Sequence, residues 1–308
     1  MEPGGRQGGV TADRTSAACE RVRFDVAGAD IVGDLHLPAG RGPFAALVVG
    51  GPMTSVKEQV TGVYARELAA RGFAALAIDH RHFGESGGLP RQYENYADKI
   101  ADLKAGIAYL ATRPDIDRGR LGATGVCLGA GYAAWAAVEN PLVRAFGAVA
   151  GYYRDPADMR ARDPAGFDAR VEQGRAARRR FEQSGQVDIV PAAALQGDAA
   201  MQTTDTVDYY TRRAVVPNYR NEFAVMSREH FLPFDVQAAA PRLSVPVMMV
   251  HSETALSPPW ARKFHDALSV EKHMVWLSSC GQTDFYDEPS LVAAAVDRLA
   301  GHFARHLG

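Results

Sequence analysis

The sequence predicts an α/β fold, in which a doubly wound and mostly parallel sheet has helices on both faces. Two observations support this prediction. Short, continuously apolar runs such as "FAALVVGG" and "FAALAIDH" are typical of strands that are covered on both faces. These runs alternate with segments of helical periodicity, the order that builds a parallel sheet. With 308 residues, 47% of them hydrophobic, the chain can bury one large core or two modest ones.

The expected elements follow a Gly-rich start. Residues 1–20 lack the apolar stretch of a secretory signal, and we expect them to form a disordered lead-in. Strands are then expected at 21–28, 30–38, 44–51, 73–80, 120–125, 145–153, 245–252 and 273–278, the first two being antiparallel. Helices are expected at 60–71, 95–111, 130–140, 258–268 and 290–307.

Local signals justify individual elements. The first two strands are joined by a turn at Gly28-Ala29. Gly72 closes the helix at 60–71, because glycine accepts the backbone conformation that ends helices. In the helix at 95–111, four apolar side chains fall on one face: Ile100, Leu103, Ile107 and Leu110.

The alternation of strands and helices stops between residues 154 and 236. This segment is charged and helical at first, with an Arg-rich face typical of a solvated helix, and then irregular and aromatic. We expect it to form a cap inserted between two parts of one core, residues 21–153 and 237–308. Its aromatic side chains indicate either the core of the cap or the wall of a pocket for an apolar substrate: Tyr209, Tyr210, Tyr219, Phe223, Phe231 and Phe234.

Composition excludes several classes of partner. The net charge of −2 gives no reason to expect nucleic acid or a membrane surface, and no apolar run is long enough to span a bilayer. Three sparse cysteines favour free thiols and a cytoplasmic setting. No nicotinamide, P-loop or metal motif is evident, so we expect a small-molecule substrate and no cofactor. A homodimer remains open.

The stretch "GVCLG", Gly125 to Gly129, predicts a nucleophile at a sharp turn. It follows a short strand and opens an Ala-rich helix. Such a strained strand-to-helix turn lifts one side chain to the top of the sheet, and its glycines relieve backbone crowding. The start of the helix favours a thiolate and a developing oxyanion. Cys127 is therefore the candidate nucleophile.

With this turn in place, the chain resembles the α/β-hydrolase superfamily, closest to its dienelactone-hydrolase-like and acyl-peptidase-like branch. The resemblance covers residues 21–307 and rests also on "GGPMTSVKEQ", "DHRHFGESGG" and "SSCGQTDFYDEP". Dienelactone hydrolases also place a cysteine at this turn, which fits Cys127. The resemblance implies an oxyanion hole formed by the backbone N–H groups of Leu128 and Met53.

The rest of the family's catalytic triad is missing. The position of the acid is Ala255 and the position of the base histidine is Gln282. An alanine cannot orient a base, and a neutral amide cannot take a proton from a thiol. We therefore expect an atypical triad, in which Cys127, Ala255 and Gln282 occupy the positions of the nucleophile, the acid and the base.

Other polar residues are candidates to replace the base. Glu253 lies on the same loop as Ala255, His82 stands where relatives commonly have glycine, and His230 lies in the irregular part of the cap. Each has an ordinary structural alternative, as a solvated or packed side chain. Gln282 itself could hold a water molecule or donate a hydrogen bond.

Three functions remain open at this stage. The first is a thiol-dependent hydrolase or acyltransferase that acts on an ester, lactone or thioester. A free thiol with a pKa of about 8.5 is a few per cent ionised near neutrality, so Cys127 could act without a histidine. The second is a cyclase, isomerase or lyase that uses the oxyanion hole to polarise a carbonyl. The third is a binding protein that keeps only the fold.

Overall fold

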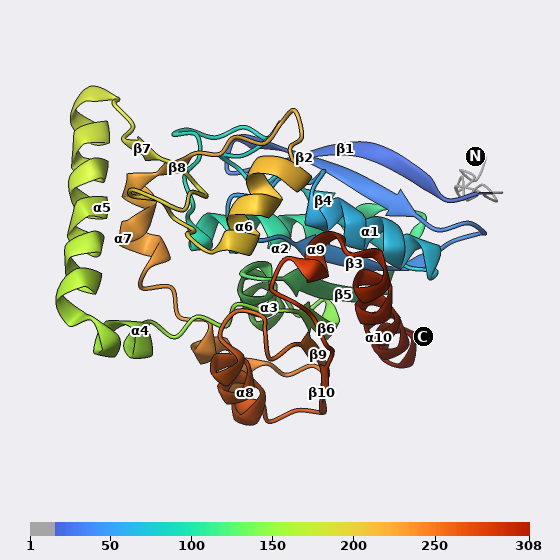
Figure 1. Ribbon diagram of the computed structural model, residues 1–308. Coiled ribbons are helices and arrows are strands. Elements are labelled where there is room, and N and C mark those ends of the chain that lie inside the picture. Colours follow the sequence, from blue (N-terminus) through green and yellow to red (C-terminus); the bar gives the residue numbers. More distant parts are fainter. Residues whose placement is uncertain (1–15) are drawn as a thin grey trace, which may run out of the picture.

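The structure is a computed structural model, and it describes residues 16–308 (Figure 1). The lead-in expected at residues 1–20 lies mostly outside the described residues. Its end was wrongly placed, because strand β1 already begins at Ala18. Residues Ala18 to Glu20 pair with Leu37 to Leu35 of β2 and are largely exposed, so they lack the apolar pattern that marks the buried strands.

An eight-stranded mixed sheet forms the centre of the described chain. Its order is β1-β2-β4-β3-β5-β6-β9-β10, and all neighbours from β4 onward are parallel. The antiparallel pairs are β1 with β2 and β2 with β4. The strands are β1 (Ala18–Val26), β2 (Ala29–Leu37), β3 (Phe44–Gly50), β4 (Ala74–Ile78), β5 (Ile116–Val126), β6 (Val143–Val149), β9 (Val247–His251) and β10 (Lys272–Trp276).

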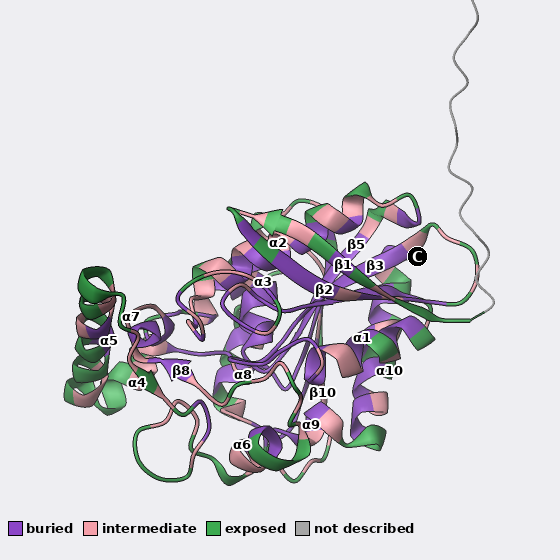
Figure 2. Cartoon of the chain, turned by 90° about the horizontal axis from the view of Figure 1, so that it is seen from above, coloured by how far each residue is buried: buried purple, intermediate pink, exposed green. Residues whose placement is uncertain are grey.

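Helices cover both faces of the sheet, which confirms the doubly wound α/β class. The helices α1 (Val60–Ala70) and α10 (Pro289–Leu307) pack together on one face, and α2 (Tyr96–Thr112) and α3 (Gly129–Glu139) pack together on the other (Figure 2). Helix α8 (Pro258–Ala267) follows β9, and the short α9 (Asp284–Asp287) follows β10. The central strands are buried on both sides, as their continuous apolar runs predict.

Residues 154–236, which we call the cap segment, lie beyond the strand ends of the sheet. They contain α4 (Pro156–Arg162), α5 (Pro164–Ser184), β7 (Ile189–Val190), α6 (Thr204–Asp208), the π-helical turn η1 (Tyr209–Arg213), β8 (Phe223–Ala224), η2 (Val225–Ser227) and α7 (Arg228–Phe231). A turn η3 (Gln237–Arg242) leads back to β9. The Arg-rich α5 stands farthest from the sheet with its outer face exposed, while its inner side packs on α7 (Figures 1 and 2).

Candidate active site

Cys127 occupies the tight turn between β5 and α3. Its backbone has a φ of 57°, in the left-handed region that non-glycine residues rarely adopt. The Cys127 N–H donates to the Val149 carbonyl at 3.2 Å, and its carbonyl accepts from Tyr152 N–H at 2.9 Å. These bonds fix the turn against the end of β6. The geometry is that of a nucleophile elbow, with the thiol at the carboxyl edge of the sheet.

Close backbone contact explains the glycines of the elbow. A Cβ atom on Gly125 would lie 2.2 Å from the carbonyl oxygen of Gly129, and one on Gly129 would lie 2.3 Å from that of Gly50. Only glycine fits such an approach between the start of α3 and the end of β3. The elbow therefore lies directly beside the loop that follows β3, where Met53 stands.

Polar groups surround the Cys127 sulfur. The hydroxyl of Tyr286, the backbone N–H of Leu128 and the side chain of Gln282 lie close enough to it to lower the pKa of the thiol. Burial and, to a smaller extent, the Asp205 carboxylate nevertheless raise the pKa of the thiol to about 11, because they outweigh the lowering by these three groups. The expectation of a few per cent thiolate was therefore wrong, because desolvation outweighs the donors and the helix start.

Gln282 fills the position that the resemblance gives to the base. Its side chain is buried, and its Nε2 donates to the Ala150 carbonyl at 2.8 Å. Its Oε1 accepts from the backbone N–H of Leu256 at 2.9 Å. Leu256 follows Ala255, the residue at the position of the acid. The Leu256 N–H thus orients the Gln282 amide, as the acid of a full triad would orient the histidine.

Tyr286 is a site residue that the sequence reasoning missed. Its hydroxyl lies 3.3 Å from Nε2 of Gln282 and is close enough to the Cys127 sulfur to lower the pKa of that thiol. Burial raises the pKa of this phenol well above its ordinary value, so it stays protonated. The signal that could have found it is spacing: Gln282 and Tyr286 are i and i+4 around the start of α9, which places both on one side of a helical turn.

The cap segment contributes aromatic side chains next to this cluster. Tyr209 lies 4.9 Å from Tyr286 and 5.0 Å from Tyr210, measured between ring centroids. The Tyr210 hydroxyl reaches the Met53 carbonyl at 3.5 Å. Asp205 of the same segment accepts a hydrogen bond from the Gln282 backbone N–H at 3.0 Å. The cap segment therefore touches both loops that flank Cys127.

The other proposed bases lie elsewhere. Glu253 is exposed and forms an ion pair with Arg262. His82 lies 3.2 Å from an Asp98 oxygen, and its φ of 77° explains why glycine suits this position in relatives. The rings of His82 and His230 both lie near Tyr93, at 5.3 and 6.5 Å. None of the three hydrogen-bonds the Cys127 thiol within residues 16–308.

The two loops with family-like sequence are joined by a buried ion pair. Lys57 of "GGPMTSVKEQ" lies 2.9 Å from Asp79 of "DHRHFGESGG", and both side chains are fully buried. The Lys57 ammonium also pairs with Glu58 at 2.7 Å and with Glu85 at 2.5 Å. The three carboxylates are close enough together to hold a metal ion, but here the Lys57 ammonium is the cation that pairs with them. This pairing fixes the loop that contains Met53.

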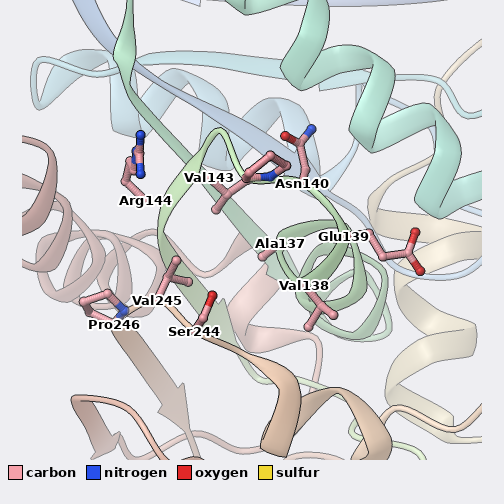
Figure 3. A pocket seen from close by; sticks show the side chains of 10 residues that line it. Ala137, Val138, Glu139, Asn140, Val143, Arg144, Ser244, Val245 and Pro246 are labelled. Carbon is pink, nitrogen blue, oxygen red and sulfur yellow. The ribbon is translucent and has the colours of Figure 1, made fainter.

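A cavity of about 490 Å³ lies far from Cys127 (Figure 3). It is lined by the end of α3 and the start of β6, residues 137–141, 143 and 144, and by residues 244–246 before β9. Helix α3 begins just after Cys127, and its eleven residues at about 1.5 Å each place this cavity roughly 15 Å away. Ligands of parallel sheets bind at the carboxyl ends of the strands, and this cavity is at the opposite edge.

The sheet order, the elbow and the loops around it define an α/β-hydrolase fold. A model of the FrsA-like esterase family matches residues 8–153. The chain belongs to the α/β-hydrolase superfamily, and it is an enzyme of the hydrolase class. No helix of the described residues is long and apolar enough to cross a membrane.

Two of its relatives match most of the chain, and a third matches less than half of it. It is 33% identical to the uncharacterised protein YcjY of Escherichia coli K12, over 86% of this chain and 89% of that one. The crystal structure of PA2218 from Pseudomonas aeruginosa superposes with a TM-score of 0.81, 26% identity and 99% coverage of both chains. Over 136 residues, 44% of this chain and 42% of the relative, it is 32% identical to thiohydrolase aneE of Aspergillus aculeatus.

Proposed function

We propose that the enzyme cleaves the acyl groups of thioesters, or transfers them, with Cys127 as the nucleophile and no catalytic histidine. The observation that supports this proposal most is the Cys127 thiol itself, at a strained elbow with Tyr286, Gln282 and the Leu128 N–H around it. One relative carries the name thiohydrolase, which is the same class of reaction. A cysteine at the elbow also fits the dienelactone hydrolases that the sequence resembles.

Thioesters suit this site because their cleavage needs little help from a general acid or base. A thiolate leaving group is far less basic than an alkoxide, since thiols ionise near pH 8.5. Transfer of an acyl group from one thiol to another also changes the free energy little, because one thioester replaces another. A site without a histidine can therefore form an acyl-enzyme from a thioester more readily than from an alkyl ester.

The first step needs a path for the thiol proton. As the Cys127 sulfur attacks the carbonyl carbon, its proton passes to the Tyr286 oxygen, and Tyr286 passes its own proton to the departing sulfur. The C–S bond to the leaving group breaks and a new C–S bond to Cys127 remains. Tyr286 ends unchanged, which suits a phenol too weakly acidic to ionise. The N–H groups of Leu128 and Met53 would stabilise the oxyanion.

The second step is the slower one in this proposal. Water must lose a proton to attack the acyl-enzyme, and Gln282 is a neutral amide that cannot accept it. A thiol or alcohol acceptor that enters through the same relay competes well with water. The site therefore favours acyl transfer or slow hydrolysis over fast hydrolysis.

A second candidate is a non-hydrolytic cyclase, isomerase or lyase. The raised pKa of Cys127 favours it, because a protonated thiol is a poor nucleophile. In that reaction Leu128 and Met53 would polarise a carbonyl, and Gln282 would donate a hydrogen bond to the substrate.

The two candidates differ in their need for the sulfur. We would compare the hydrolysis of N-acetylcysteamine hexanoate and ethyl hexanoate by the wild type, Cys127→Ala, Tyr286→Phe and the control Cys280→Ala, which removes an exposed thiol. We expect the thioester to be preferred and Cys127→Ala to be inactive. Tyr286→Phe should slow acylation by roughly 100-fold, and Cys280→Ala should leave it unchanged. Full activity of Cys127→Ala would exclude covalent catalysis.

A further inference from the structure

Arg154 is a fully buried cation close to the elbow. It follows β6, and its backbone N–H donates to the carbonyl of Tyr152, whose own N–H donates to the Cys127 carbonyl. Only 2% of Arg154 is exposed. Tyr132 lies in the first turn of α3, five residues after Cys127, and its backbone N–H donates to the Leu128 carbonyl at 3.2 Å.

The Arg154 guanidinium has protein partners of only a weak kind. Its Nη2 donates to the Leu232 carbonyl at 3.1 Å, and the Phe231 ring covers one face with its centroid 4.1 Å away. Its Nε is buried and has no hydrogen-bond partner. No carboxylate of residues 16–308 forms an ion pair with it. Burial accordingly lowers the pKa of the group, although an arginine remains charged.

The other buried cations of the described chain differ from Arg154 in this respect. Lys57 lies 2.9 Å from Asp79, and Lys99 lies 2.8 Å from Glu94. A buried charge is costly unless an opposite charge and hydrogen bonds compensate it. The missing anion at Arg154 is therefore best supplied by a ligand. The unpaired Nε–H, together with a second hydrogen on Nη2, matches the two oxygens of a carboxylate.

We propose that Arg154 binds a carboxylate on the acyl chain of the substrate, so that the enzyme acts on half-thioesters of dicarboxylic acids. This inference rests on the proposed function for the reacting end of the substrate. The carboxylate binds in the plane of the guanidinium, since the Phe231 ring covers its face. The acyl chain runs past Tyr132 and its thioester carbonyl reaches Cys127.

Two cavities of the cap segment are lined by residues that contact Arg154. Phe231 and Leu232, which contact Arg154, line a cavity of about 310 Å³ that also includes Arg170 and Arg228. A second cavity of about 180 Å³ shares Arg170 and Leu232. Arg228 is paired with Asp198 at 2.5 Å, whereas Arg170 is exposed. The positive charge of Arg170 would attract an anionic acyl chain to these cavities.

The test measures binding without chemistry. Titration calorimetry on Cys127→Ala would compare monomethyl esters of the acids from succinic to sebacic acid with their neutral dimethyl esters. We expect at least one monoester to bind ten-fold or more tightly than its diester. Adding Arg154→Met should abolish this preference, and Arg154→Lys should keep only part of it, because lysine lacks the planar fork. Arg305→Met, which removes an exposed arginine of α10, is the control and should change nothing.

Three results would overturn the proposal. One is that no monoester binds more tightly than its diester, a result that needs no Arg154 variant and so stands even if Arg154→Met fails to fold. Another is an unchanged preference in Arg154→Met or in Arg154→Lys. The third is an equal loss of affinity for the monoester and the diester in Arg154→Lys, which would mean that Arg154 only stabilises the packing of the cap segment on the core. Because Cys127 is absent, these results are independent of whether it is the nucleophile.

Discussion

Cys127 should behave as a protonated thiol at neutral pH. Burial raises its pKa to about 11 from an ordinary value of 9.0. At pH 7 such a thiol is ionised in roughly one molecule in 10,000, against roughly one in 100 for a thiol at that reference pKa of 9.0. The difference corresponds to roughly 3 kcal/mol against the folded thiolate. We therefore expect alkylation of Cys127 to be about 100-fold slower at pH 7 than alkylation of the same thiol in the unfolded chain.

The assay follows the reaction of iodoacetamide with the variant Cys19→Ala/Cys280→Ala, which leaves Cys127 as the one thiol of the chain. The rate constant should rise about tenfold per pH unit from pH 7 to pH 9, because the thiolate is the reacting form. The same variant unfolded in urea gives the reference rate. A plateau of the rate below pH 9 in the folded protein would refute the reasoning, since it would mean that the surrounding donors outweigh burial.

The same pKa shift links Cys127 to stability. The folded-state pKa is raised, so the stabilising contribution of the neutral thiol is complete below about pH 9 and is lost as the pH rises toward 11. Between pH 9 and pH 11, the free energy of unfolding should therefore fall less for Cys127→Ala than for the wild type, as measured by urea unfolding.

Three substitutions test the surroundings of the thiol. Asp205→Asn removes a carboxylate that raises the pKa of Cys127, so alkylation at pH 8 should become several-fold faster; an unchanged pH profile would show that this charge does not act on the sulfur. Gln282→His should raise the hydrolysis of 4-nitrophenyl acetate, because its imidazole would stand beside the thiol; no gain would mean that the turn is placed differently from that of relatives with a full triad. Gly125→Ala would push a methyl group to 2.2 Å from the Gly129 carbonyl oxygen and should destabilise the fold by about 3 kcal/mol or more. Thermal unfolding would measure this loss, and in the same assay the control Gly301→Ala, whose added methyl meets no atom within 4 Å, should be neutral or stabilising.

Most of the fold was predictable because the buried strands have a recognisable, continuously apolar sequence. A strand such as β3 or β4 is apolar throughout, and a helix such as α2 shows its buried side in the spacing of Ile100, Leu103 and Ile107. The start of β1 was not predictable in this way. Residues Ala18 to Glu20 belong to an edge strand, and they are held by backbone pairing with β2 rather than by burial of their side chains.

The elbow was equally predictable, since its glycines and cysteine are local in sequence. The placement of Gln282 and Ala255 followed from a resemblance to known triads. The environment of the thiol could not be predicted, because it depends on Tyr286 and Asp205, which the fold brings together from different segments. For the same reason, the ring contacts of His82 and His230 with Tyr93 could not be predicted, and neither histidine is among the groups that shift the pKa of the thiol.

The most direct test is to look for the acyl-enzyme. The wild type would be mixed with N-acetylcysteamine hexanoate, quenched with acid at short times and digested, and the peptides analysed by mass spectrometry. A hexanoyl group on the peptide that contains Cys127, formed before the product thiol reaches its steady rate, is the predicted result. Sustained turnover with no acyl group on Cys127 at any time would contradict the account.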